Sequence, residues 1–256
     1  MLNRIYCLYA AFWFLLMMAV LFPFYFVLIQ NKKWRKHTHI LNRIWARVVL
    51  GMCFIPIRVE RRGKYDKGPY VFCANHFSYL DIASMTFAPA DFMFTGKASL
   101  AKVPGLGYIF RKLHITVDRF SKEGRKTAFD NYLKALEEGK SLAIFPEGGI
   151  CSKQPPTMAP FKQGAFAAAI EKKCPIVPVT IPYNWIILPD DGKFILKRRP
   201  AMIIFHEPIV TEDLTEDDLE TLKNKTFNII QEELYKYNRD ENRQGNAQKD
   251  RAFSPA

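Results

Sequence analysis

The chain is poor in cysteine, and the few cysteines it has follow no recognisable pattern. Its 256 residues include five cysteines, an odd number, and no two of them form a C-x-x-C pair. A disulfide framework and a zinc ribbon both need paired cysteines, so neither is expected, and a reducing compartment is the default. The sequence also lacks an internal repeat and a Gly-x-Ser-x-Gly turn, which argues against a repeat architecture and against the serine nucleophile of an α/β-hydrolase.

Charge is absent from residues 5–30, which read IYCLYAAFWFLLMMAVLFPFYFVLIQ. A run of this length is sufficient to cross a bilayer. A cleavable signal peptide is not expected, because a Lys-Lys-Trp-Arg-Lys cluster follows the run instead of a small-residue cleavage site. The cluster predicts that the rest of the chain lies on the cytoplasmic face. Pro23 would kink a helix, so the segment either spans the membrane or re-enters on the same side.

Acidic residues are scarce in the first 70 residues, which contain twelve basic and two acidic side chains. This segment therefore carries most of the net charge of +12 of the whole chain. Basic charge beside the most apolar segment favours contact with anionic lipid headgroups over nucleic acid. The stretch HILNRIWARVVLGMCFIPI has apolar residues at three- and four-residue steps, which predicts an amphipathic helix. Such a helix lies at the membrane interface or packs on the folded domain.

From Pro69 onward, short apolar runs alternate with helical periodicity. Strands are predicted at PYVFCAN, DFMFTG, HITVD, SLAIFPEGG (a strand running into a turn), PIVPVTI, KFILKRR and AMIIFHE. Helices are predicted from Asp81, over GRKTAFDNYLKALEEGK and KQGAFAAAIEKK, and from Thr215 to about Tyr237. This pattern predicts an α/β domain with a mostly parallel sheet flanked by helices. The expected division is a two-helix membrane segment at 1–58, a catalytic domain at 59–238 and a disordered tail at 239–256.

Two polar turns, NHFSYLD and FPEGG, follow predicted strands. In parallel sheets, functional sites form at the carboxyl ends of strands, so the two turns are expected to lie together. A carboxylate on one ring nitrogen fixes the tautomer of a histidine, and the other nitrogen then accepts a proton. His76 and Asp81 are therefore a candidate base and its orienting carboxylate. A metal site built from His76 and Asp81 lacks a matched third ligand, although Glu147 or His114 could be brought close.

Other polar residues near these strand ends have less specific local signals. Glu147 could bind a hydroxyl of a polyol, and Gly148 could let the backbone approach a ligand. Lys97 and Arg119 follow predicted strands, and Arg119 could hold a phosphate through two hydrogen bonds. Each of these three charged residues could equally be an ordinary surface charge.

The motifs together resemble the 1-acylglycerol-3-phosphate acyltransferase family and related glycerolipid acyltransferases. NHFSYLD matches the N-H-x4-D motif, and GKASLAKVPGLGYIF...HITVDR, FPEGG and PIVPVTI follow in the family's order from about residue 70 to 182. The resemblance implies a glycerol-3-phosphate acyltransferase-like fold and an O-acyltransferase of membrane phospholipid synthesis. It implies no metal or other cofactor.

The resemblance also implies a role for each candidate residue. His76 would be the general base, with Asp81 orienting it, and Lys97 and Arg119 would hold the phosphate of the acceptor. Glu147 and Gly148 would help to place that acceptor, which would be lysophosphatidic acid. The donor would be a thioester of acyl carrier protein or coenzyme A, and the product would be phosphatidic acid. Membrane lipids are expected partners, and nucleic acid is not.

Gly149 departs from the family pattern, in which threonine or serine usually follows Glu-Gly. The reaction class is unaffected, but the acceptor could instead be another lysolipid or an amino-acid lipid. A membrane-anchored hydrolase and a non-catalytic lipid-binding module are the alternatives from other functional classes. Acyl chain length, the choice of donor and the oligomeric state have no signal in the sequence.

Overall fold

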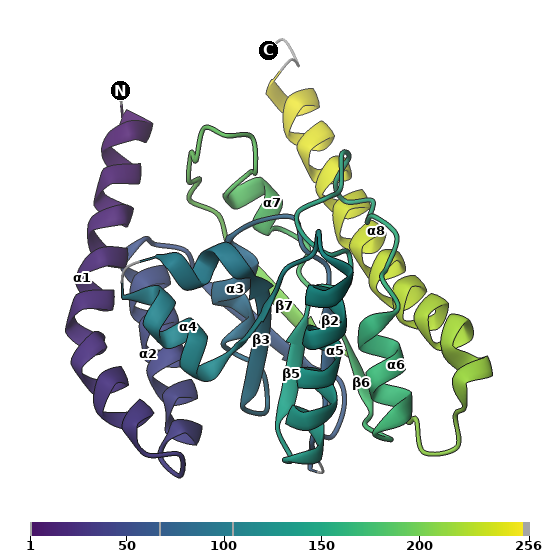
Figure 1. Cartoon of the computed structure of the whole chain (residues 1–256). Coiled ribbons are helices and arrows are strands. Elements are labelled where there is room, and N and C mark those ends of the chain that lie inside the picture. The colour runs from purple at the N-terminus through teal and green to yellow at the C-terminus, as the bar shows by residue number, and fades with distance from the viewer. Residues whose placement is uncertain (1, 67, 104, 253–256) are drawn as a thin grey trace.

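A sheet of seven strands lies at the centre of the protein, with helices on both of its faces (Figure 1). The computed structural model describes residues 2–66, 68–103 and 105–252. The strands are β1 (Ile57–Arg61), β2 (Val71–Ala74), β3 (Phe92–Lys97), β4 (Ile115–Val117), β5 (Ser141–Ile144), β6 (Ile176–Thr180) and β7 (Ala201–Phe205). The α-helices are α1 (Leu2–Gln30), α2 (Thr38–Met52), α3 (Leu80–Met85), α4 (Leu106–Leu113), α5 (Lys122–Glu137), α6 (Gly164–Glu171), α7 (Asn184–Ile187) and α8 (Leu219–Ala252).

The sheet is mostly parallel. Its strand order is β1-β7-β6-β2-β5-β3-β4, and β6 with β7 is the antiparallel pair among these neighbours. The predicted α/β class is therefore confirmed. Strands β2, β3, β4, β5 and β6 run in the same direction, so the segments that follow them all leave the same edge of the sheet.

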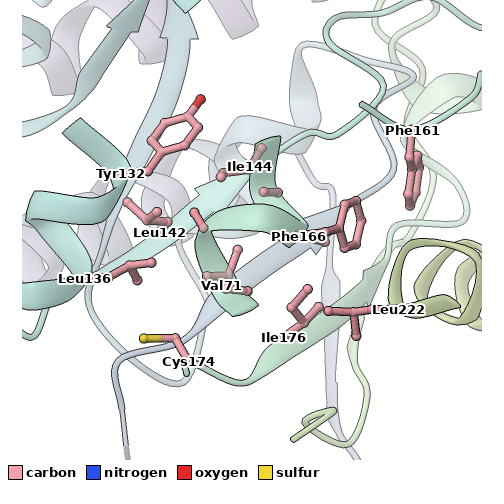
Figure 2. Packing of buried hydrophobic residues seen from close by; sticks show 14 of the residues in the cluster. Val71, Tyr132, Leu136, Leu142, Ile144, Phe161, Phe166, Cys174, Ile176 and Leu222 are labelled. Carbon is pink, nitrogen blue, oxygen red and sulfur yellow. The ribbon is translucent and has the colours of Figure 1, made fainter. Parts of the chain in front are cut away.

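The central strands are buried on both faces, which explains their continuous apolar sequences. Every residue of β2, β5 and β6 is buried. On one face these strands pack beneath α5, α6 and α8, and Figure 2 shows Phe166 and Leu222 from two of these helices in the same cluster as Ile176. On the other face Phe72 and Phe205 pack with Met85 and Phe110, near α3 and α4. Covering both faces leaves the strand ends as the places for polar chemistry.

Helices α1 and α2 lie side by side at one side of the domain (Figure 1). The segment Asn3–Gln30 is long and apolar enough to cross a membrane, by length and composition alone. One face of α1 is buried against the protein through Ala10, Leu21, Tyr25 and Ile29. The N-terminus thus has one strongly apolar helix, followed by an amphipathic one.

One prediction about local structure was wrong, and one strand was missed. The stretch KFILKRR is irregular and not a strand, because Phe194 has a φ of 51° and the Lys197 N–H donates to the Ile187 carbonyl. Strand β1 was not predicted, because its sequence IRVER is charged, as edge strands often are. Helix α8 has the bounds Leu219–Ala252, and the predicted disordered tail at 239–256 stays a prediction. Residues 253–256 lie outside the described residues.

Candidate active site

The turn NHFSYLD leaves the carboxyl end of β2 and is anchored first by Asn75. This asparagine is fully buried, and its side chain binds both backbone groups of Ile181, which follows β6. Its Nδ2 donates to the Ile181 carbonyl over 3.0 Å, and the Ile181 N–H donates to its Oδ1 over 2.8 Å. The ends of two neighbouring strands are therefore fastened together directly before His76.

Asp81 organises the rest of this turn. It lies in the first turn of α3 and is fully buried. Its Oδ2 accepts a hydrogen bond from the His76 Nδ1–H over 3.0 Å, and others from the Phe77 and Ser78 N–H groups over 2.8 and 2.9 Å. The chain between the histidine and the aspartate thus wraps around one carboxylate oxygen, which explains the spacing of five residues. The structure brings this predicted pair together.

The imidazole of His76 is held in a defined orientation. Its ring stacks on Phe145 with 4.0 Å between ring centroids and an angle of 15° between the planes. Its side chain is only 11% exposed. Because Nδ1 is engaged by Asp81, the neutral ring carries its proton there and Nε2 is the basic nitrogen. The arrangement can take a proton from a hydroxyl placed at Nε2.

Glu147 lies beneath the same histidine, in the turn after β5. It is 2% exposed, its Oε1 accepts the backbone N–H of His76 over 2.7 Å, and its Oε2 accepts the N–H of Ala159 over 2.8 Å. Burial raises the pKa of Glu147 to about 7, and the charge of Asp81 adds to that rise against the two backbone hydrogen bonds. In this structure the carboxyl group therefore joins three segments of the site.

Glu147 is expected to contribute a fall in the free energy of unfolding as the pH rises from about 4.5 to about 7. In that interval the unfolded chain has lost this proton while the folded protein still holds it, so the stabilisation is complete below the interval and lost above it. Buried His114 and His206, whose pKa values are lowered to about 4 by burial, contribute in the opposite direction, so the effect of Glu147 is read as the difference in pH dependence between the wild type and Glu147→Gln. The loss due to Glu147 should be about 3 kcal/mol. Denaturant unfolding at the two ends of the interval measures it in the wild type and in Glu147→Gln. An equal change of the unfolding free energy with pH in both proteins would contradict a buried, ionisable Glu147.

Arg119 and Lys97 lie at the same edge of the sheet but are placed differently. Arg119 follows β4, and its Nη1 donates to the Gly148 carbonyl in the turn after β5. Lys97 ends β3, is exposed, and makes no hydrogen bond or ion pair within the described part of the chain. Gly148 has a φ of +86°, which glycine adopts without strain. The structure thus brings Arg119 against FPEGG and leaves Lys97 at the rim.

The structure adds one polar residue that the sequence did not indicate. Asn184, the first residue of α7, is fully buried and its Nδ2 donates to Asp81 Oδ1 over 3.0 Å. The two residues are 103 positions apart, so no local spacing could have revealed the contact. Among the described residues, no group of three His, Cys, Asp or Glu side chains is arranged to hold a metal ion. A metal-free reaction stays a prediction.

Comparison with known proteins gives one consistent result. The model of a family described as Acyltransferase matches residues 56–182. A 1-acyl-sn-glycerol-3-phosphate acyltransferase of Saccharomyces cerevisiae is 36% identical over 70% of this chain and 60% of its own length. A chloroplastic 1-acyl-sn-glycerol-3-phosphate acyltransferase of Brassica napus is 24% identical over 80% of this chain and 60% of its own length. The matched region is thus about 60% of each relative.

A solved structure agrees at the level of the fold. The crystal structure of the 1-acyl-sn-glycerophosphate acyltransferase PlsC from Thermotoga maritima superposes with a TM-score of 0.75 and 20% sequence identity. The superposition covers 92% of this chain and 98% of that one. The family match contains His76, Asp81, Lys97, Arg119 and Glu147, and it ends just after β6. Residues 56–182 thus belong by sequence to the acyltransferase family, and the fold of the chain agrees with that of the solved relative.

Proposed function

We propose that this protein transfers a fatty acyl group from a thioester of coenzyme A or acyl carrier protein to the free hydroxyl of 1-acyl-glycerol-3-phosphate. The observation that carries the proposal is the buried His76–Asp81 pair at a sheet edge shared with Arg119. A histidine fixed through Nδ1 is equipped to activate a hydroxyl, and a nearby guanidinium suits the phosphate of a lysolipid. The names of the relatives support this choice of acceptor.

The proposed reaction needs no covalent enzyme intermediate. Nε2 of His76 takes the proton of the acceptor hydroxyl while the hydroxyl oxygen attacks the thioester carbonyl carbon. The tetrahedral intermediate then collapses, the carbon–sulfur bond breaks, and the leaving thiolate takes the proton back from the imidazolium. The products are phosphatidic acid, which contains the new ester bond, and a free thiol. Asp81 stabilises the imidazolium while it carries the extra proton.

The acceptor phosphate is assigned to Arg119 and Lys97. One N–H of Arg119 is used by the Gly148 carbonyl, which fixes the direction of the guanidinium and leaves its other donors for a ligand. Lys97 supplies a second cation from the neighbouring strand β3. Gly148, and Glu147 through the turn it stabilises, place the acceptor relative to His76.

We propose that the outer faces of α1 and α2 insert into the membrane. Helix α1 is fastened to the domain near both ends, since Tyr6 Oη donates to the Cys53 carbonyl over 2.6 Å and Gln30 Nε2 donates to Tyr108 Oη over 3.0 Å. Its outer face is apolar, with Leu8 at 72% exposure. Because both ends of α1 are attached to the domain, we propose that the helix lies in the cytoplasmic leaflet and does not cross the bilayer.

Helix α2 has exposed apolar side chains at the protein surface. Its Arg43 donates to the Thr86 carbonyl over 3.2 Å and so faces the domain, whereas Arg47 is exposed, with its guanidinium 5.9 Å from the Phe87 ring centroid. Ile40 and Ile44 are 46% and 41% exposed. An outward apolar side and the adjacent cluster of Lys32, Lys33, Arg35 and Lys36 suit an anionic membrane surface.

A panel of acceptors with one isotope-labelled acyl thioester tests the proposed function. We expect labelled phosphatidic acid from lysophosphatidic acid, and little free fatty acid when no acceptor is added. The panel should include lysolipids with other headgroups and an amino-acid lipid. Fatty acid released at the same rate without an acceptor would contradict the proposal and favour a hydrolase.

A different lysolipid is the second candidate acceptor, and Gly149 is the observation that favours it. A Cβ at this position would lie 3.1 Å from Arg119 Nη1 and 3.4 Å from Cys151 Sγ, on a backbone with a φ of +156°. The glycine therefore lets Arg119 lie against the turn more closely than a threonine or serine would.

The panel should accordingly be repeated with Gly149→Ser. Gly164→Ser is the control, because a Cβ there meets nothing within 4 Å. If Gly149 sets headgroup preference, the ratio of kcat/KM between acceptors changes by about tenfold in the first variant and not in the control. An unchanged ratio in both variants would remove Gly149 from the account of specificity.

A further inference from the structure

Asn184 contacts Asp81 of the NHFSYLD turn, which is called the catalytic turn below, and none of the sequence motifs includes this asparagine. Its side chain lies at the start of α7, which follows β6. It is fully buried, and its Nδ2 donates to Asp81 Oδ1 over 3.0 Å and to Ser84 Oγ over 2.9 Å. Both N–H bonds of the amide are therefore directed at α3.

Asn184 provides the hydrogen-bond donor to the second oxygen of the Asp81 carboxylate. Three donors converge on Oδ2, from His76, Phe77 and Ser78. Oδ1 accepts from Asn184, and the carboxylate is closed off from solvent. A buried carboxylate oxygen without a donor is strongly unfavourable, so this hydrogen bond helps to decide how the group is turned.

The orientation of the amide itself follows from its neighbours. Its Oδ1 is buried without a hydrogen-bond partner among the described residues. Turning the amide over would place that oxygen against Asp81 Oδ1, where two acceptors repel each other. The amide therefore gives up one acceptor bond to keep its donors on Asp81 and Ser84.

We infer that Asn184 is a positioning residue, which holds the Asp81 carboxylate in the plane that directs Oδ2 at His76 Nδ1. The inference rests on the proposed function, in which His76 is the base. The segment around Asn184 is fixed on both sides. Ser78 Oγ donates to the Leu188 carbonyl over 2.7 Å, and Asn75 holds Ile181. Helix α7 is thus part of the support of the catalytic turn.

Two replacements separate positioning from simple packing. Asn184→Leu removes both N–H donors at similar volume. Asn184→Asp puts a second carboxyl group beside Asp81, and because the two groups share one proton, a donor to Asp81 is kept. The other charged or titratable groups around His76 are Asp81 itself, Glu147 at its backbone N–H, and Arg119 at the Gly148 carbonyl. Neither variant replaces any of these three residues. Thr211→Val is the control for a buried polar contact elsewhere, because Thr211 is fully buried and its Oγ1 donates to the Ala169 carbonyl.

The decisive readout is the titration of His76 in the full-length protein, followed by NMR on isotope-labelled histidine. The signal is assigned among the five histidines by its loss in His76→Ala. In Asn184→Leu the Asp81 carboxylate is no longer held in the plane that directs Oδ2 at His76 Nδ1, so the imidazolium is less stabilised and the midpoint should fall by about one pH unit. Thr211→Val should leave it unchanged. An identical midpoint in the wild type and Asn184→Leu would overturn the inference.

Catalysis provides the second readout. Asn184→Leu should lower kcat by about a hundredfold at constant folded fraction, because the base is no longer held in line. KM for the acceptor should not change, since Asn184 is buried behind Asp81 and does not reach the acceptor. A loss that tracks the unfolded fraction alone would also count against positioning. The NMR titration needs no substrate, so it distinguishes an error about Asn184 from an error about the reaction.

Discussion

Replacing His76 with alanine is expected to lower the rate of acyl transfer by about a thousandfold or more. A positioned general base contributes roughly 10²- to 10⁴-fold to a rate, and both the ring and the backbone of this histidine are held in place. Asp81 binds Nδ1, Phe145 stacks on one face, and Glu147 holds the backbone N–H. A rate assay with labelled thioester and lysophosphatidic acid measures the loss in kcat.

His206 provides a matched control for His76→Ala. It is also buried, and its Nε2 is hydrogen bonded to Thr180 Oγ1 over 2.8 Å instead of to a carboxylate. Burial lowers the pKa of His206 to about 4, so it is neutral at physiological pH. His206→Asn should lower stability more than it lowers kcat, whereas His76→Ala should do the reverse and leave vesicle binding intact. Equal losses of kcat in both variants would contradict a specific role for His76.

Asp81→Asn is expected to lower kcat by roughly 10³- to 10⁴-fold, the size of the loss when the aspartate beside a catalytic histidine becomes asparagine in serine proteases. The asparagine oxygen can still accept from the His76, Phe77 and Ser78 N–H groups, so the turn should keep its shape. The negative charge that stabilises the imidazolium is lost. The profile of kcat/KM against pH measures both effects.

The direction of the pH effect follows from the charge. Without the carboxylate, His76 holds its proton less tightly, so the acid limb of the profile should move to lower pH in Asp81→Asn. The shift has the same direction as the one expected for Asn184→Leu. Activity within about tenfold of the wild type, with an unmoved acid limb, would show that Asp81 does not orient a base.

Local sequence was sufficient to predict those parts of the site whose residues all lie in one segment of the chain. The continuous apolar runs of β2, β5 and β6 predict buried strands, and the polar turns after them then meet at one edge. His76 and Asp81 lie within one turn, so their contact follows from a spacing of five residues. The fold class could be predicted for the same reason, since alternation of strands and helices is a local pattern.

Contacts between distant segments could not be predicted. Asn184 meets Asp81, and Arg119 meets Gly148, only because β6 and β4 end at the same edge as β2 and β5. The stretch KFILKRR has the composition of a strand, but the Leu196 N–H donates to Cys7 Sγ of α1 over 3.4 Å. Tertiary contacts of this kind override local propensity, and a single segment contains no sign of them.

The central claim is that His76 activates the hydroxyl of a lysolipid for direct attack on an acyl thioester. The most direct measurement is the product formed by the purified full-length protein in mixed micelles, from a labelled acyl-coenzyme A with and without 1-acyl-glycerol-3-phosphate. The account predicts labelled phosphatidic acid only when the acceptor is present, and almost none from His76→Ala. Phosphatidic acid formed by His76→Ala at the wild-type rate, or labelled fatty acid released regardless of the acceptor, would contradict it.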